Sequence, residues 1–134
     1  MPSLPRLRHR ISDALLCRLL TPGGGFTWSP RTGAVVTEGF AVSPFKDREE
    51  VHLFNKVDRR ETAAFVKLNS DLLFTAPGYH LRFVGAWHCP DDGLVYLDVS
   101  VVLPTAKQAN ATARKSKQIA YYDFAAGASV LVKA

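Results

Sequence analysis

The hydrophobic pattern of residues 94–103 (LVYLDVSVVL) is that of a β-strand with one buried face. Its odd-numbered positions are all Val or Leu, whereas its even-numbered positions include Tyr96, Asp98 and Ser100. Side chains alternate between the two faces of a strand, so the odd face should lie under helices. The other face is mixed, and a half-buried Asp98 there needs a polar partner. We predict that this segment is the central strand of a sheet.

Three segments show the spacing or the start signals of amphipathic helices. In the first, apolar side chains recur every four residues until the Pro- and Gly-rich residues 21–25 interrupt the pattern. These side chains are Leu7, Ile11, Leu15 and Leu19. The second and third helices, predicted over 58–73 and 105–117, begin with the capping sequences Asp-Arg-Arg-Glu and Thr-Ala-Lys-Gln. The third has only alanines on its inner face, which favours close packing on a sheet.

Shorter apolar segments predict the other strands. In chain order they are 26–28, 34–42, 79–87, 119–124 and 129–133, and the charged loop after residue 42 leaves room for a short strand at 51–54. The turn Pro90-Asp91-Asp92-Gly93 joins 79–87 to the central strand as an antiparallel hairpin. From residue 34 onward the order is strand, helix, strand, strand, helix, strand.

This order predicts an α+β fold with the βαββαβ arrangement of ferredoxin-like domains. The helices would cover one face of an antiparallel sheet, and the other face would be open or covered by the N-terminal helix. A short strand follows at the C-terminus, and an α+β sheet of another strand order is the alternative. We divide the chain into a basic amphipathic helix with a Gly-rich linker, residues 1–24, and a single α+β domain, residues 25–134.

Length, charge and cysteine content narrow the class of protein. The chain has 134 residues and a net charge of +5. No apolar run approaches the roughly 20 residues of a membrane-spanning helix, so we expect no membrane association. Two cysteines, Cys17 and Cys89, are too few for a disulfide framework and favour a reducing compartment, although a single bridge stays open. The Arg-rich start, with Arg6, Arg8 and Arg10, suits a solvated helix face, a transit peptide, or an arm that binds nucleic acid or an acidic membrane.

Candidate catalytic and metal-binding residues are sparse. His80 and His88 are eight residues apart on one predicted strand, roughly 26 Å, so they cannot share a metal ion unless the strand bends sharply. We therefore expect no metal and no cofactor. His80 and Asp98, with Arg82 and a hydroxyl from Tyr96 or Tyr121, could form a general acid–base set on the open face. A solvated polar face explains the same residues more simply.

Nucleic-acid signatures are also weak. RNA-recognition domains of this topology carry a Lys/Arg-Gly-Phe/Tyr run in the third strand, and residues 94–103 lack both the glycine and the base. Gly23-Gly24-Gly25 lacks the Lys-Ser/Thr pair of a phosphate-binding loop. The remaining nucleic-acid hypothesis rests on Arg6, Arg8 and Arg10.

Three runs carry a resemblance to known sequences: residues 24–44 (GGFTWSPRTGAVVTEGFAVSP), 85–104 (GAWHCPDDGLVYLDVSVVLP) and 117–124 (KQIAYYDF). They resemble a group of small proteins encoded by actinobacterial phages and mobile elements. The group shares a Gly-Phe-Thr start, a Tyr-Leu-Asp-Val-Ser strand and a Gln-x-Ala-x-x-Asp segment. The resemblance implies an origin and a bacterial cytoplasm as the place of action, but no activity.

Together these patterns predict a non-catalytic accessory protein that binds a host protein or associates with itself as a homodimer. The predicted contact surfaces are the N-terminal stripe and the open sheet face, with Leu7, Ile11, Leu15, Leu19 and Tyr96 as partner-binding residues. The alternative is a nucleic-acid-binding or small nuclease-like protein that uses Arg6, Arg8, Arg10 and the open face.

Overall fold

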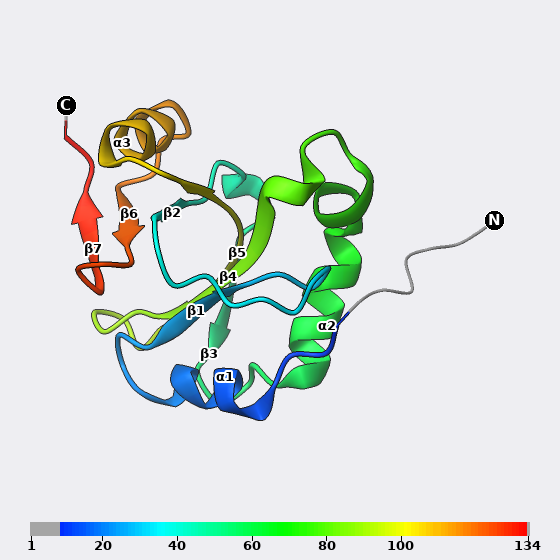
Figure 1. Cartoon of the computed structure of the whole chain (residues 1–134). Helices are drawn as coiled ribbons and strands as arrows, with labels where there is room; N and C mark the ends of the chain where they lie inside the picture. Colours follow the sequence, from blue (N-terminus) through cyan, green and yellow to red (C-terminus); the bar gives the residue numbers. More distant parts are fainter. Residues whose placement is uncertain (1–8, 134) are drawn as a thin grey trace.

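The computed structural model describes residues 9–133, which form one seven-stranded antiparallel sheet with helices packed on one of its faces (Figure 1). Six strands follow one path, β1-β4-β5-β2-β6-β7, and β3 pairs with β5 beside it. The strands are β1 (Gly25–Trp28), β2 (Phe40–Val42), β3 (Glu50–Leu53), β4 (Arg82–His88), β5 (Leu94–Leu103), β6 (Ala120–Asp123) and β7 (Ala128–Leu131).

Strand β5 organises this sheet, as the sequence pattern predicts. It pairs with β4 along one edge, while β3 pairs with its first half and β2 with its second half along the other edge. Val95, Leu97 and Val99 are completely buried on its apolar face. The hairpin with β4 is confirmed, and Cys89 N–H closes it by donating to the carbonyl of Leu94 at 2.8 Å.

The helices begin where the capping sequences place them. In α2 (Arg59–Leu68), Oδ1 of Asp58 accepts the Glu61 N–H at 2.9 Å, and in α3 (Ala106–Lys115), Oγ1 of Thr105 accepts the Gln108 N–H at 3.2 Å. The second helix is shorter than predicted, because Asn69 caps α2 and the chain continues as a π-helical turn, Asp71–Thr75.

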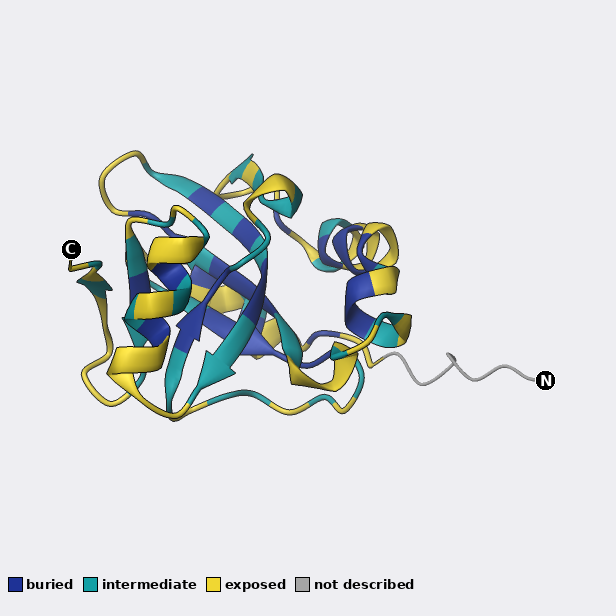
Figure 2. Ribbon diagram, turned by 90° about the horizontal axis from the view of Figure 1, so that it is seen from above, coloured by how far each residue is buried: buried dark blue, intermediate teal, exposed yellow. Residues whose placement is uncertain are grey.

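The core has two parts, one under each end of β5. The larger part packs Phe65 of α2 and Leu73 against the first half of β5 and against β4. The smaller part packs Ala109 and Ala113 of α3 against Val42. Both alanines are completely buried, which confirms the predicted close approach of α3 to the sheet. Figure 2 shows the buried inner side and exposed outer side of α3.

The N-terminal helix is shorter than the sequence pattern predicts. Helix α1 spans only Asp13–Cys17, because Ser12 caps it, and a 3₁₀ turn, Arg18–Leu20, follows. Of the predicted stripe, Ile11, Leu15 and Leu19 are buried in the larger core, and Leu7 lies outside the described residues. These three side chains therefore complete the chain's own core and are not exposed to a partner in this structure. The proposed boundary at residue 24 also runs through this core.

Two strands start later than predicted. Gly39 adopts φ +94°, so β2 begins only at Phe40, and Val35 forms an isolated bridge with Trp28. A 3₁₀ turn, Tyr79–Leu81, occupies the start predicted for β4. The α+β class and the antiparallel sheet are confirmed, whereas β1, β3 and β7 make the sheet larger than a four-stranded ferredoxin-like one. Within residues 9–133, no helix is long and apolar enough to cross a membrane.

Candidate functional site: a cleft on the concave face of the sheet

The sheet face opposite the helices is concave and contains a cleft of about 860 Å³. Its floor comes from β1, β4 and β5, and its far wall comes from β6 and β7, which curl round from the other end of the sheet. The even-numbered positions of β5 face this cleft, so the mixed face predicted from the sequence is the one that the helices leave uncovered. It is the candidate functional site.

Gly85 and Asp98 form the centre of the cleft floor. They are cross-strand neighbours, with Gly85 of β4 opposite Asp98 of β5 and also opposite Thr27 of β1. A Cβ atom at residue 85 would overlap Oδ1 of Asp98 and would lie 2.9 Å from Oγ of Ser100. The Asp98 carboxylate therefore lies over Gly85, in space that any other residue there would occupy.

The Asp98 carboxylate has few protein partners. The Ser100 hydroxyl donates to its Oδ1 at 2.5 Å, and within residues 9–133 this is its one hydrogen bond to the protein. Burial, helped by the negative charge of nearby Glu49, raises the pKa of the Asp98 carboxyl to about 6, although the hydrogen bond from Ser100 lowers it. Asp98 is thus a half-buried acid that titrates close to neutral pH.

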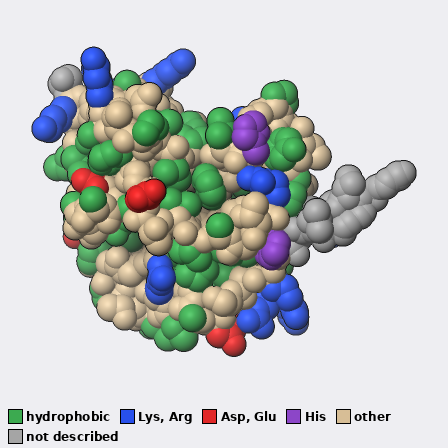
Figure 3. Space-filling view, in the orientation of Figure 1, with side chains coloured by type: hydrophobic (Ala, Val, Ile, Leu, Met, Phe, Trp, Pro, Cys, Tyr) green, Lys and Arg blue, Asp and Glu red, His purple; other side chains and the backbone are tan. Residues whose placement is uncertain are grey.

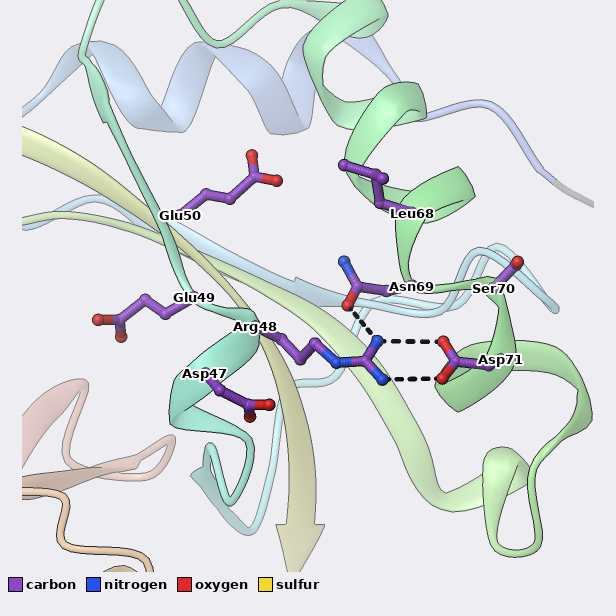
Figure 4. A pocket seen from close by; sticks show the side chains of 8 residues that line it. All are labelled: Asp47, Arg48, Glu49, Glu50, Leu68, Asn69, Ser70 and Asp71. Atoms are coloured by element: carbon purple, nitrogen blue, oxygen red, sulfur yellow. Dashed lines mark hydrogen bonds and ion pairs between the residues drawn. The ribbon is translucent and has the colours of Figure 1, made fainter.

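Glu49 is the second carboxylate of the cleft. It lies directly before β3, one residue beyond the Glu50–Leu97 pair, and therefore next to Asp98. Burial raises the pKa of Glu49, while the positive charge of Lys46 lowers it. Figure 4 shows Glu49 pointing away from its neighbour Arg48, so the two side chains lie on opposite sides of this segment.

Half-buried aromatic side chains line the cleft. They are Trp87 and Tyr96 on the floor, and Tyr122 and Phe124 on the wall. The Trp87 and Tyr96 ring centroids are 6.5 Å apart, and those of Tyr122 and Phe124 are 5.1 Å apart. The Tyr96 hydroxyl donates a short hydrogen bond to Asp92, which raises the pKa of Tyr96 to about 12 and lowers that of Asp92. This bond fixes the Tyr96 ring in place.

The structure does not assemble the predicted acid–base set around Asp98. His80 lies outside β4 on an exposed turn, and the Arg82 guanidinium donates to the carbonyls of Leu72 and Pro77 at 3.1 Å each. The Tyr121 ring packs against Phe40 in the smaller core, with centroids 6.0 Å apart. Of the predicted open-face residues, only Asp98 and Tyr96 share the cleft floor.

The other candidate residues also lie apart from the cleft centre. His88 is buried, and its Nδ1 is 2.8 Å from the Leu19 carbonyl oxygen. Cys17 is exposed, Cys89 is buried, and both are free thiols. Arg10 is exposed, whereas Arg6 and Arg8 lie outside the described residues. In the described part of the chain, no three His, Cys, Asp or Glu side chains converge in a geometry that could hold a metal ion.

A second hollow of about 570 Å³ is shallower and lies between the 3₁₀ turn Lys46–Arg48 and the end of α2. Here Arg48 donates to Asn69 at 3.0 Å and, through both terminal nitrogens, to the two oxygens of Asp71 at 3.1 and 2.8 Å (Figure 4). Arg48 lowers the pKa of Asp71 to about 2. Arg48, Asn69 and Asp71 therefore satisfy one another across this hollow.

Sequence reasoning identified Asp98 and Tyr96 but missed Gly85, Trp87 and Glu49 as parts of the site. Gly85 did carry a signal, because a glycine inside an apolar strand often marks the close approach of another group. Glu49 carried none, since its position depends on β3 pairing with β5.

No protein-family model, curated protein or solved structure matches this chain.

Proposed function

We propose that this protein is a binding protein that receives its partner in the concave cleft. One observation carries the proposal: the cleft brings an under-bonded carboxylate and four aromatic rings together on the sheet face that the helices leave uncovered. Concave sites with apolar walls and a few convergent polar groups are the usual form of binding sites in proteins.

Binding is favoured over catalysis because the cleft floor lacks an evident catalytic set. Asp98 can exchange a proton near neutral pH, and Ser100 donates a hydrogen bond to it. Among the described residues, however, no histidine lies beside Ser100 to act as its base, and His88 contacts the Leu19 carbonyl instead. A nucleophilic mechanism of the serine–histidine type therefore has no support in the described residues.

We further propose that the protein is an accessory protein of a phage or mobile element, acting in a bacterial cytoplasm on a host protein or on its own copies. This part rests on the resemblance of residues 24–44, 85–104 and 117–124 to such proteins. The same three runs supply most of the residues that line the cleft. A shared sequence signature that converges on one cleft is consistent with a shared binding function.

The ferredoxin-like relationship is also a proposal. Its support is the neighbour order β4-β5-β2-β6, in which α2 lies between β2 and β4 in the chain, after the additional strand β3, and α3 connects β5 to β6. This is the arrangement of a βαββαβ unit with both helices on one face. Such a unit leaves its second face free, and in this chain that face forms the cleft floor.

A pair of matched leucine variants tests the binding proposal. Leu131 is 72% exposed at the cleft rim, and Leu68 is 70% exposed on α2, outside the cleft. Tagged wild type, Leu131→Glu and Leu68→Glu are used for pull-downs from an actinobacterial lysate, with and without nuclease, and their masses in solution are compared. We expect nuclease-resistant retention of one partner, or self-association, that Leu131→Glu reduces and Leu68→Glu preserves. Equal behaviour of the two variants would contradict a cleft-centred site.

Nucleic-acid binding is the second candidate, and one surface favours it. No acidic residue occurs between residues 99 and 122, and exposed cations gather on and beside α3. They are Lys107, Arg114, Lys115, Lys117 and Lys133. Figure 3 shows Lys and Arg side chains projecting from this end of the molecule. In the pull-down, partners that disappear on nuclease treatment, with steeply salt-dependent retention, would favour this surface and the Arg6, Arg8 and Arg10 arm.

A further inference from the structure

We infer that the cleft binds an organic cation, that is, a protonated amine or a guanidinium carried on an apolar body. The ammonium or guanidinium would lie between Asp98 and Glu49, and the apolar body would lie against Trp87 and Tyr96. This inference rests on the proposed binding function and adds the chemical class of the bound group, either a free amine or a basic side chain of a partner.

The first argument is the unused bonding capacity of the floor. An ionised carboxylate has about four acceptor positions, and within residues 9–133 the protein fills one of those of Asp98, through Ser100. Gly85 makes room for this carboxylate, which lies over the Gly85 backbone on the cleft floor. Partial burial disfavours the charge of Asp98, and a bound cation would supply both an opposite charge and further donors.

The second argument is the charge balance of the cleft. Its acidic side chains are Glu49, Asp91, Asp92 and Asp98, and its basic side chains are Arg18 and Lys46. Both basic side chains are exposed; Lys46 donates to the carbonyl of Lys117 at 3.4 Å, and its positive charge offsets part of the charge of Glu49. The negative charges therefore prevail near the floor. An anionic ligand would meet Asp98 and Glu49 without a buried cation to offset them.

The third argument is the aromatic lining beside the carboxylates. Trp87 and Tyr96 form the next residue pair on the same face of the sheet, two positions along the strands from Gly85 and Asp98. The faces of aromatic rings attract cations, and they also cover the apolar stem of an amine. Because Asp92 holds the Tyr96 hydroxyl, this ring is in position before a ligand arrives. Carboxylates next to aromatic rings are a chemical environment suited to cations, whereas a purely apolar ligand would cover Asp98 without supplying an opposite charge.

Three probes with the same indole body separate charge from shape. Tryptamine is cationic, tryptophol is neutral and indole-3-acetate is anionic at pH 7.5. Isothermal titration of the full chain should show tryptamine binding about tenfold or more tightly than tryptophol, and indole-3-acetate binding most weakly, because a hydrogen bond to a charged group contributes more than a neutral one. The variant Asp98→Asn should lose this preference for tryptamine while keeping its affinity for tryptophol.

A peptide arm identifies the source of the cation. The probes are the blocked pentapeptide Gly-Gly-Lys-Gly-Gly and its acetyl-lysine counterpart. Tighter binding of the lysine peptide than of tryptamine points to a protein side chain, and the reverse points to a free amine; both support the inference. Loss of lysine-peptide binding in Asp98→Asn, with an unchanged thermal unfolding midpoint or a higher one, separates a lost contact from a lost fold.

Two results would overturn the inference. The first is binding of tryptophol or indole-3-acetate as tight as that of tryptamine, which leaves a binding cleft without selectivity for cations. The second is no measurable binding of any cationic probe at millimolar concentration. Neither result affects the comparison of Leu131→Glu with Leu68→Glu, so failure of the cation inference and failure of the binding proposal are distinguishable.

Discussion

The cleft and the hollow beside α2 each contain a carboxylate, one half-buried and one exposed, and the two carboxylates differ in their partners. Beside α2, Asp71 accepts two hydrogen bonds from Arg48, and its pKa falls to about 2. In the cleft, Asp98 accepts one hydrogen bond from a neutral hydroxyl, and its pKa rises to about 6. The first carboxylate has its partner within the chain and joins two segments of the fold. The second lacks one, which marks the cleft as the place where a partner from outside would be bound.

The largest effect is expected from Gly85→Ala, because the new methyl group would overlap the Asp98 carboxylate and crowd Ser100. We expect a loss of about 2 kcal/mol in the free energy of unfolding, typical of overpacking, together with weaker tryptamine binding. Urea unfolding monitored by tryptophan fluorescence measures the first effect, and titration calorimetry the second. An unchanged stability would mean that Asp98 can leave the floor at little cost, and would weaken the assignment of the site.

The next largest effect is expected from Asp98→Asn, and it has the opposite sign. Folding raises the pKa of Asp98 above that of the unfolded chain, so the ionised carboxylate destabilises the fold at pH 7. The variant should therefore be roughly 1–2 kcal/mol more stable at pH 7.5. This gain should shrink as the pH falls below about 6 and vanish at about pH 3, where Asp98 is protonated in both the native and the unfolded chain. Thermal unfolding across this range measures it, and a variant less stable at pH 7.5 would contradict the account.

The smallest effect is expected from Arg48→Ala, because the Arg48–Asp71 pair is partly exposed. Folding lowers the pKa of Asp71, so the pair stabilises the fold above pH 4 and loses this contribution as the pH falls through about 2. Arg48→Ala should lower the unfolding midpoint slightly at pH 7 and by less at pH 2, where the ion pair is largely lost. This pH dependence runs opposite to that of Asp98→Asn. The same dependence in both variants would remove the contrast between the two hollows.

The local features of the fold were readable from the sequence. The alternation along residues 94–103 identified β5 and its two faces, and the capping residues Asp58 and Thr105 marked the starts of α2 and α3. The turn at residues 90–93 identified the hairpin. Each of these features depends on side chains within a few residues of one another, so short-range stereochemistry and hydrophobic alternation determine them.

Tertiary structure decided the composition of the site. Gly85 reaches Asp98 through the register of β4 on β5, Glu49 reaches it through the pairing of β3, and the curl of β6 and β7 supplies Tyr122. It also placed His80 outside the cleft. It directed Ile11, Leu15 and Leu19 into the core rather than toward a partner.

The physical reason for this division is the range of the interactions. The sequence by itself determined which face of β5 would be apolar and that Asp98, on the other face, would need a partner. Which residues would surround Asp98 was decided by pairing between strands that are distant in the chain. A shift of one residue in that register would have turned a different set of side chains toward the cleft.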